Sequence, residues 1–204
     1  SIYLISGNLT TWRLQHNVLH HTYTNIEGLD DDLDSRGLLR LHPDQPLKPL
    51  HRFQVLYAPF LYSLLTLNWV MMKDFAQLIR YQKTGVAKLS EEKLRSEWVK
   101  LIYTKIIYFS LFIVLPQVFL EVSWFVPLIG FVVMHAIAGF VLSFVFQLAH
   151  VVDHVDAVTM PTGEKPMDDE FMEHQLKTTS DFARRSKIVG WFVGGLNFQV
   201  EHHL

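Results

Sequence analysis

A long run of apolar residues marks the second half of the chain. Residues 125–149 contain no Asp, Glu, Lys or Arg, and the run follows Trp124, an aromatic residue of the kind that gathers at membrane interfaces. A helix needs about 20 mostly apolar residues to cross a bilayer core of ~30 Å. Residues 125–149 are therefore predicted to form a transmembrane helix.

A second apolar run precedes the first one closely. Residues 98–120 are apolar apart from Lys100 and Lys105, which lie near the start of the run and are expected to extend toward the membrane interface. A short turn around Glu121 separates the two runs. Together they predict a transmembrane hairpin.

A third apolar run, residues 53–72, differs from the other two. It contains Gln54 and Asn68 and is interrupted by Pro59. Basic residues lie on both sides of it: Arg36, Arg40, Lys48 and Arg52 before, and Lys73, Arg80, Lys83, Lys88, Lys93 and Arg95 after. Since positive charge concentrates on the cytoplasmic side of a membrane, we expect this segment to be interfacial or re-entrant and not to cross.

The same charge pattern extends beyond the hairpin. Arg184, Arg185 and Lys187 place the C-terminal segment on the cytoplasmic side as well. The predicted fold is an all-α integral membrane protein with a transmembrane hairpin and a cytoplasmic helical cap that is rich in histidine.

Composition narrows the chemistry of this cap. The formal net charge of −2 gives no basic excess, so a nucleic-acid partner is not expected. The chain has no Cys, which excludes disulfides, iron–sulfur clusters, thiolate zinc sites and cysteine nucleophiles. Among 204 residues there are 11 His. Histidine, aspartate and glutamate remain as candidate metal ligands.

Seven histidines form three clusters: His16, His20 and His21 in QHNVLHH, His150 and His154 in LAHVVDH, and His202 and His203 in QVEHH. On an α-helix, His16 and His20 share a face, while His21 is rotated by about 100° and could serve a neighbouring ion. Imidazole is a ligand suited to iron, zinc, copper and nickel. The clusters therefore predict a site for two metal ions on the cytoplasmic side.

The remaining histidines are not expected to bind a metal ion. His42, His51 and His174 are expected not to be ligands. His135 lies in the middle of the best transmembrane run, where an imidazole needs a polar partner, so we expect it to bond a neighbouring helix.

Several acidic residues lie near the histidine clusters. Asp153 and Glu201 are either acceptors for the N–H of a ligating imidazole or solvated acids, and His154 is either a ligand or a residue that supports one. The run GLDDDLD, with four acids at Asp30, Asp31, Asp32 and Asp34, is interpreted as a solvated loop or helix start. The alternative is a direct ligand role, as in carboxylate di-iron sites, but the E-x-x-H spacing usual in those sites does not occur in this chain.

The histidine clusters resemble those of a known family. QHNVLHHTYTN is similar to the second histidine box, and QVEHH to the third, of membrane fatty acyl desaturases. The likeness extends over GLDDDLD, the hairpin, FQLAH, HQLKTTSDFA and GGLNFQVEHHL. Gln199, where many members have His, resembles the front-end, linoleoyl-CoA-desaturase-like branch.

The resemblance implies specific roles for these residues. It implies that His16, His20, His21, His202 and His203 are iron ligands and that His150 is an additional ligand just past the last transmembrane helix. Gln199 would be a weaker ligand that acts through water, and no catalytic residue beyond the metal ligands is implied.

The resemblance also implies an activity. Two irons, reduced by an external electron donor such as cytochrome b5 or ferredoxin, would use O2 to desaturate an acyl-CoA or acyl-lipid in the membrane. A lipid hydroxylase of the same histidine-box kind remains an alternative. A membrane haem-binding electron carrier is an alternative of another class, but only His135 lies mid-span as an axial ligand would.

One departure from the family concerns the first histidine box. No H-D-x-x-H motif occurs, and the chain begins at Ser1 and ends in QVEHHL. We therefore expect a single desaturase domain, 1–204, truncated at both ends, with an incomplete metal site and no activity of its own.

Overall fold

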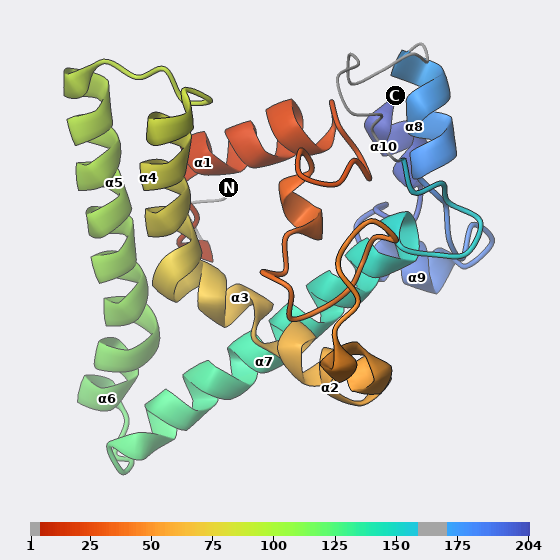
Figure 1. Ribbon diagram of the computed structural model, residues 1–204. Coiled ribbons are helices and arrows are strands. Elements are labelled where there is room, and N and C mark those ends of the chain that lie inside the picture. Colours follow the sequence, from red (N-terminus) through yellow and green to blue (C-terminus); the bar gives the residue numbers. More distant parts are fainter. Residues whose placement is uncertain (1–4, 159–170) are drawn as a thin grey trace. The chain divides into compact units, whose positions relative to one another are not determined.

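The computed structural model describes residues 5–158 and 171–204, and every regular element in these residues is a helix (Figure 1). A single bridge between Ile26 and Val158 is the only β-type pairing among them. The all-α prediction is confirmed. The described residues divide into two compact units, one formed by the chain up to Leu14 and Phe60–Val141, the other by Gln15–Pro59 and Leu142–Leu204.

The first unit contains the two long helical runs. α5 (Glu91–Phe109), a π-helical turn (Ser110–Val114) and α6 (Leu115–Phe119) follow one another as a 29-residue helical stretch. α7 (Phe125–His150) has 26 residues, of which the last nine belong to the second unit. Both runs are long and apolar enough to cross a membrane, as residues 98–120 and 125–149 predicted.

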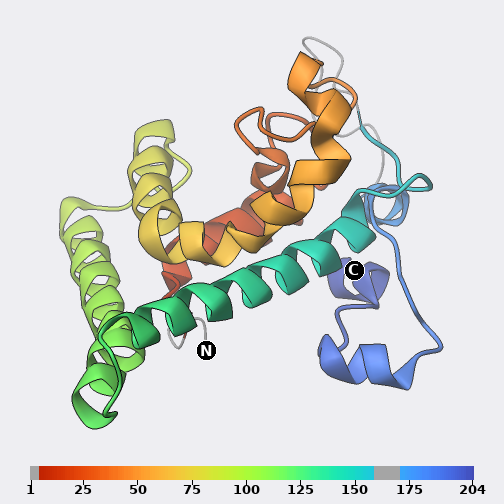
Figure 2. The same cartoon turned by 90° about the horizontal axis from the view of Figure 1, so that it is seen from below.

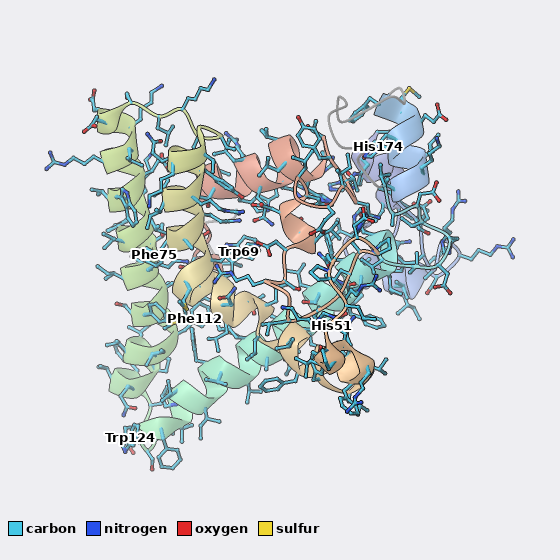
Figure 3. The ribbon with its side chains drawn as sticks, in the orientation of Figure 1. His51, Trp69, Phe75, Phe112, Trp124 and His174 are labelled. Atoms are coloured by element: carbon cyan, nitrogen blue, oxygen red, sulfur yellow. The ribbon has the colours of Figure 1, made fainter. Side chains whose placement is uncertain are left out.

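The turn between the two runs is short, as Figure 2 shows at its lower left. Trp124 lies at this turn with an exposed indole (Figure 3). At the other end of the run, Ser90 caps α5 by accepting a hydrogen bond from the backbone N–H of Lys93, and Glu91 and Glu92 occupy the first turn. Acids in a first turn favour a helix N-terminus because they complement its positive dipole end.

The core of the first unit lies between the long helices. Val70, Tyr108 and Phe131 are buried there, packed against Leu67, Phe109, Ile113 and Met134. His135 joins this core: its Nε2 lies 3.2 Å from the Tyr108 hydroxyl and its Nδ1 lies 3.1 Å from the Thr66 hydroxyl. The expected bond from the mid-span imidazole to a neighbouring helix is present.

The third apolar run is broken. α2 (Gln54–Ser63) contains Pro59, and α3 (Leu65–Asn68), a π-helical turn (Trp69–Lys73) and α4 (Asp74–Thr84) follow Leu64. The helical direction bends by 50° at this break. Pro59 removes a backbone donor inside α2, but the break comes five residues later, at Leu64, whose backbone N–H donates to Leu61 at 3.1 Å in a tighter i,i+3 turn. That the segment 53–72 does not cross the membrane remains a prediction.

One expectation about the first unit is wrong. Lys105 does not extend to an interface but is buried, with its Nζ 2.8 Å from Asp74 Oδ2 and 2.7 Å from the Ser6 carbonyl oxygen. Asp74 begins α4, which packs against α1 (Leu9–Arg13) (Figure 1). A carboxylate partner inside the unit compensates the charge that would otherwise have to reach water.

The second unit collects the shorter helices. Its elements are a π-helical segment (Leu14–His20, of which Leu14 belongs to the first unit), 3₁₀ turns at Asp31–Leu33 and Pro49–Phe53, the first part of α2 up to Pro59, the end of α7, α8 (Phe171–Thr178), α9 (Lys187–Phe192) and α10 (Gln199–His203). α10 lies against α8 (Figure 1).

Asn25 ties the end of α7 to its neighbours in the second unit. It adopts a left-handed conformation with φ 57°, which Asn tolerates better than most residues. Its Nδ2 donates to the carbonyl oxygen of His150 at 2.7 Å and to that of Thr178 at 3.4 Å. The backbone N–H of Ser180 donates to Ala149 at 2.8 Å. The residue that ends α7 is therefore held close to α8.

Candidate metal centre

The first histidine cluster lies on a π-helical segment and not on the α-helix that the sequence predicted. Leu14–His20 is π-helical, and the backbone N–H of His21 donates to His16, five residues earlier, at 2.9 Å. A π-helix aligns residues i and i+5 along its hydrogen bonds, so His21 falls beside His16. Their Nε2 atoms are 3.2 Å apart, while the His16 and His20 rings are stacked with centroids at 5.6 Å.

The six histidines expected as ligands come together as two groups of three. His16, His21 and His202 form one group, called here the outer trio, and His20, His150 and His203 form the other, the buried trio. Within each trio the ligand nitrogens lie within 4.8 Å of one another. His202 is exposed, whereas all three residues of the buried trio are buried. The arrangement offers two metal positions.

An oxygen atom faces Nδ1 of each imidazole in the buried trio. His20 Nδ1 lies 3.1 Å from both carboxylate oxygens of Asp30, His203 Nδ1 lies 2.9 Å from Gln175 Oε1, and His150 Nδ1 lies 3.4 Å from the Thr178 carbonyl oxygen. Carboxylate, amide and carbonyl oxygens accept hydrogen bonds and do not donate them. Each Nδ1 therefore carries a proton, which leaves Nε2 as the nitrogen available to a metal.

The surroundings of the Nε2 atoms in the buried trio suit a metal ion. Among the described residues, Nε2 of His20 and Nε2 of His203 are buried and have no hydrogen-bond partner. The same is true of Nε2 of His42 outside the trios, but only the first two converge on a group of three imidazoles. A buried polar atom without a partner is destabilising by about 1–3 kcal/mol, and such atoms are rare in folded proteins. A metal ion at the buried trio would satisfy both. The histidine clusters are thus compatible with a metal centre.

Electrostatics keep the outer trio neutral. Burial and then the neighbouring imidazoles lower the pKa of His16 to about 3 and that of His21 to about 4. Burial, with the nearby His20, also lowers the pKa of His202. A neutral imidazole has the free lone pair that metal binding requires. These residues are therefore available as ligands at neutral pH.

The pKa values of His20 and His203 shift in opposite directions, although both residues are buried. Burial opposes protonation of His20, but the hydrogen bond and charge of Asp30 outweigh it and raise the pKa of His20. At His203, burial together with His150 and the other imidazoles lowers the pKa. Asp30 therefore makes His20 the more basic of these two imidazoles, an effect that a carboxylate also has on a metal-bound histidine.

The interpretation of the acidic run as solvated is wrong for Asp30. Its carboxylate is 3% exposed and accepts the backbone N–H groups of Asn25 and Asp32, each at 3.0 Å, in addition to His20. Asp30 also caps the 3₁₀ turn Asp31–Leu33, so the helix-start part of the interpretation is confirmed. Asp32 accepts a hydrogen bond from the Gln15 amide and lies near both His16 and His20.

The four weaker candidates for a ligand or supporting role differ in their position relative to the two trios. Gln199 is buried beside the buried trio: its Nε2 donates to the Leu196 carbonyl oxygen at 2.7 Å, and its side chain is hydrogen-bonded to His150. His154 is outside both trios, with Nε2 2.6 Å from the Ser180 hydroxyl. Asp153 and Glu201 are exposed, and the acceptors for the buried trio are other residues.

The histidines expected not to be ligands lie outside the two trios. His42 Nδ1 accepts the backbone N–H of Asp44 at 3.2 Å, and His51 Nε2 lies 3.2 Å from the Gly37 carbonyl oxygen. His174 is buried on α8 (Figure 3).

Two residues of the site escaped sequence reasoning. Gln175 lies in HQLKTTSDFA and Asp30 in GLDDDLD, and both segments belong to the family resemblance without a histidine-box pattern. The only signal for them in the sequence was that both segments resemble desaturases and contain polar residues, although neither contains a predicted ligand.

Comparisons with known proteins agree on one family. The family model for fatty acid desaturases matches residues 2–204. The sn-1 linoleoyl-lipid 6-desaturase of Synechocystis sp. is 35% identical over 198 residues, covering 95% of this chain and 53% of the relative. The protein of the same name from Arthrospira platensis is 33% identical, covering 95% of this chain and 51% of the relative.

A plant relative adds to this pattern. The acyl-lipid (8-3)-desaturase of Physcomitrium patens is 33% identical over 207 residues, covering 100% of this chain and 42% of the relative. The chain thus spans about half the length of the curated relatives it matches. No solved structure matches the chain.

Proposed function

Because this chain belongs to the fatty acid desaturase family, we propose that its outer and buried trios hold the two irons of an acyl-lipid desaturase. The observation that carries the proposal is the convergence of six histidines into two groups, one of which has buried Nε2 atoms without partners. Within residues 1–204, the proposed ligands are His16, His21 and His202 for one iron and His20, His150 and His203 for the other.

The proposed reaction is the desaturation of an acyl chain by O2 and two electrons. An acyl chain loses one hydrogen from each of two adjacent methylene carbons and gains a cis double bond, while O2, two electrons and two further protons leave as two waters. Bound iron would supply the oxidising power that an unactivated C–H bond requires and that no side chain provides. A small electron-transfer protein such as cytochrome b5 or ferredoxin would supply the electrons.

The protein's own residues prepare this site. Asp30, Gln175 and the Thr178 carbonyl hold the Nδ1 protons of the buried trio and so direct its Nε2 atoms inward. Phe146 packs against the rings of His20 and His150, with centroids at 5.2 and 4.7 Å, and excludes water from that side. Neutral imidazoles in the outer trio avoid charge repulsion with a cation.

The substrate class follows from the relatives and the helices. Three relatives are named for acyl-lipid substrates, which favours an acyl-lipid over an acyl-CoA. Two helices long enough to cross a membrane would keep the protein where such lipids lie. His150 ends the second of these helices, so the metal centre would lie at the membrane surface, on the side that basic residues mark as cytoplasmic.

Product analysis tests the proposal. The protein that contains residues 1–204 is expressed with an electron donor in a host that lacks its own desaturases, and total lipids are analysed by mass spectrometry. We expect an acyl product two mass units lighter than its precursor, absent from the His203→Ala variant and retained in His42→Ala. A gain of sixteen mass units would instead indicate hydroxylation, and an unchanged lipid profile would contradict the proposal.

A further inference from the structure

We propose that Gln175 is a positioning residue that fixes the tautomer of His203 and ties it to the segment carrying His21. The proposal rests on the proposed function only for the identity of the ion, because the hydrogen bonds that support it belong to the protein alone. Gln175 is on α8 and is fully buried, so its amide has no access to solvent.

Each end of the Gln175 amide has a defined role. Its Nε2 donates to the carbonyl oxygen of His21 at 2.9 Å. That carbonyl can only accept, which fixes the orientation of the amide and directs Oε1 toward His203. Oε1 lies 2.9 Å from His203 Nδ1 and 3.1 Å from the Thr24 hydroxyl, whose shorter acceptor is the His20 carbonyl oxygen at 2.7 Å.

The orientation of the amide sets the proton position on His203. Because Oε1 accepts and cannot donate, His203 must carry its proton on Nδ1. Nε2 then presents its lone pair to His20 and His150, within the buried trio. The alternative tautomer would place a proton on Nε2 and leave Nδ1 facing the lone pairs of Oε1. The buried trio would then lose one ligand.

The same amide couples the two trios. His203 belongs to the buried trio and His21 to the outer trio, and Gln175 contacts the side chain of the first and the backbone of the second. α8 also provides the Thr178 carbonyl that faces His150 Nδ1. A short helix without any proposed ligand therefore orients two of the three buried imidazoles.

Metal affinity of matched variants tests this role. Gln175→Leu removes both polar ends at similar volume, Gln175→Glu keeps an acceptor for His203, and Gln77→Leu makes the same change at a buried glutamine of the first unit. Co²⁺ binding to the purified protein that contains residues 1–204 is measured by visible absorption against a competing chelator.

The expected results differ among the three variants. Loss of a hydrogen-bond partner of a ligand typically lowers metal affinity by about 10–100-fold, and we expect this for Gln175→Leu. Gln175→Glu should stay within about tenfold of the parent, and Gln77→Leu should not change affinity. Affinity in Gln175→Leu equal to the parent, or an equal loss in all three variants, would overturn the proposal.

A measurement on the unmodified protein applies even if Gln175→Leu does not fold. Nitrogen-15 NMR of labelled histidine distinguishes the two tautomers without metal or activity. We expect His203 to be protonated on Nδ1, and protonation on Nε2 would refute the role of Gln175. If the unmodified protein binds no metal while His203 shows the Nδ1 proton, the proposed function fails and the positioning role stands.

Discussion

The buried ion pair of the first unit should respond unequally to removal of its two partners. Lys105 Nζ lies 2.8 Å from Asp74 Oδ2, and both residues are buried. Replacing one partner of a buried pair leaves an uncompensated charge, which typically destabilises a protein by about 3–5 kcal/mol. The hydrogen bonds that remain decide where in this range each variant falls.

The two partners differ in their other contacts. Without Lys105, Asp74 still accepts hydrogen bonds from the Asn8 backbone N–H at 3.3 Å, the Thr11 hydroxyl at 3.3 Å and Trp69 Nε1 at 2.9 Å. Without Asp74, Lys105 keeps the Ser6 carbonyl oxygen at 2.7 Å and the Thr11 hydroxyl keeps the Asn8 carbonyl oxygen at 3.1 Å, but the Asn8 N–H and Trp69 Nε1 lose their acceptor. We expect Lys105→Met to destabilise by about 3 kcal/mol and Asp74→Leu by about 5 kcal/mol.

The double variant separates charge from packing. Lys105→Met with Asp74→Leu contains no buried charge, and an apolar replacement of a buried pair is often close to neutral. Two donors, the Asn8 N–H and Trp69 Nε1, remain without Asp74, so we expect a loss smaller than that of Asp74→Leu alone. The free energy of unfolding in detergent is measured by tryptophan emission and far-ultraviolet circular dichroism.

A matched substitution provides the control. Lys100 forms an i,i+3 pair with Glu97 at 2.7 Å, and its side chain is half exposed. Glu97 is buried, but its carboxylate keeps the Asn8 amide at 3.2 Å, so Lys100→Met should destabilise less than Lys105→Met. Additive effects of Lys105→Met and Asp74→Leu, or a loss below about 1 kcal/mol for Asp74→Leu, would refute the assignment of a compensated buried pair.

Two further predictions concern close packing and proton binding. A Cβ at Gly139 would lie 2.8 Å from the Ser63 carbonyl oxygen and 2.9 Å from that of Tyr62, so Gly139→Ala should destabilise by about 1–3 kcal/mol. Gly130→Ala, with nothing within 4 Å, should not, and equal unfolding midpoints for the two variants would contradict this packing. Burial lowers the pKa of His16 from 6.5 to about 3, so below pH 6.5 the unfolded metal-free chain takes up a proton that the folded one does not. At pH 5.5 this lowers the free energy of unfolding by about 1.4 kcal/mol relative to pH 7.5. His16→Asn should remove that part of the pH dependence. The same slope of unfolding free energy against pH in the parent and in His16→Asn would contradict this prediction.

Length and hydropathy were sufficient to predict the long helices. All of residues 98–120 except Leu120, and all of residues 125–149, lie within the helical runs Glu91–Phe119 and Phe125–His150, because a membrane span needs a long apolar segment and little else. The position of Lys105 in the sequence did not predict where its charged end lies. Whether a lysine extends to an interface or pairs inside depends on a partner far away in sequence, here Asp74.

The sequence predicted which histidines come together but not how they group. Clustering along the chain indicated seven histidines, and the resemblance to desaturases implied the six that form the trios. Their grouping depends on the π-helical segment Leu14–His20, which brings His21 beside His16, and helix type is a property that spacing does not determine. The Nδ1 acceptors Asp30 and Gln175 were hidden because a carboxylate or amide that binds an imidazole needs no fixed spacing.

The iron content of the purified protein tests the two-trio assignment most directly. Elemental analysis of the protein that contains residues 1–204, reconstituted with Fe²⁺ without oxygen, should give two irons per chain, with a lower content for His203→Ala and an unchanged content for His42→Ala. One iron or none in the unmodified protein, or an equal content in all three, would contradict the assignment of one iron to each trio.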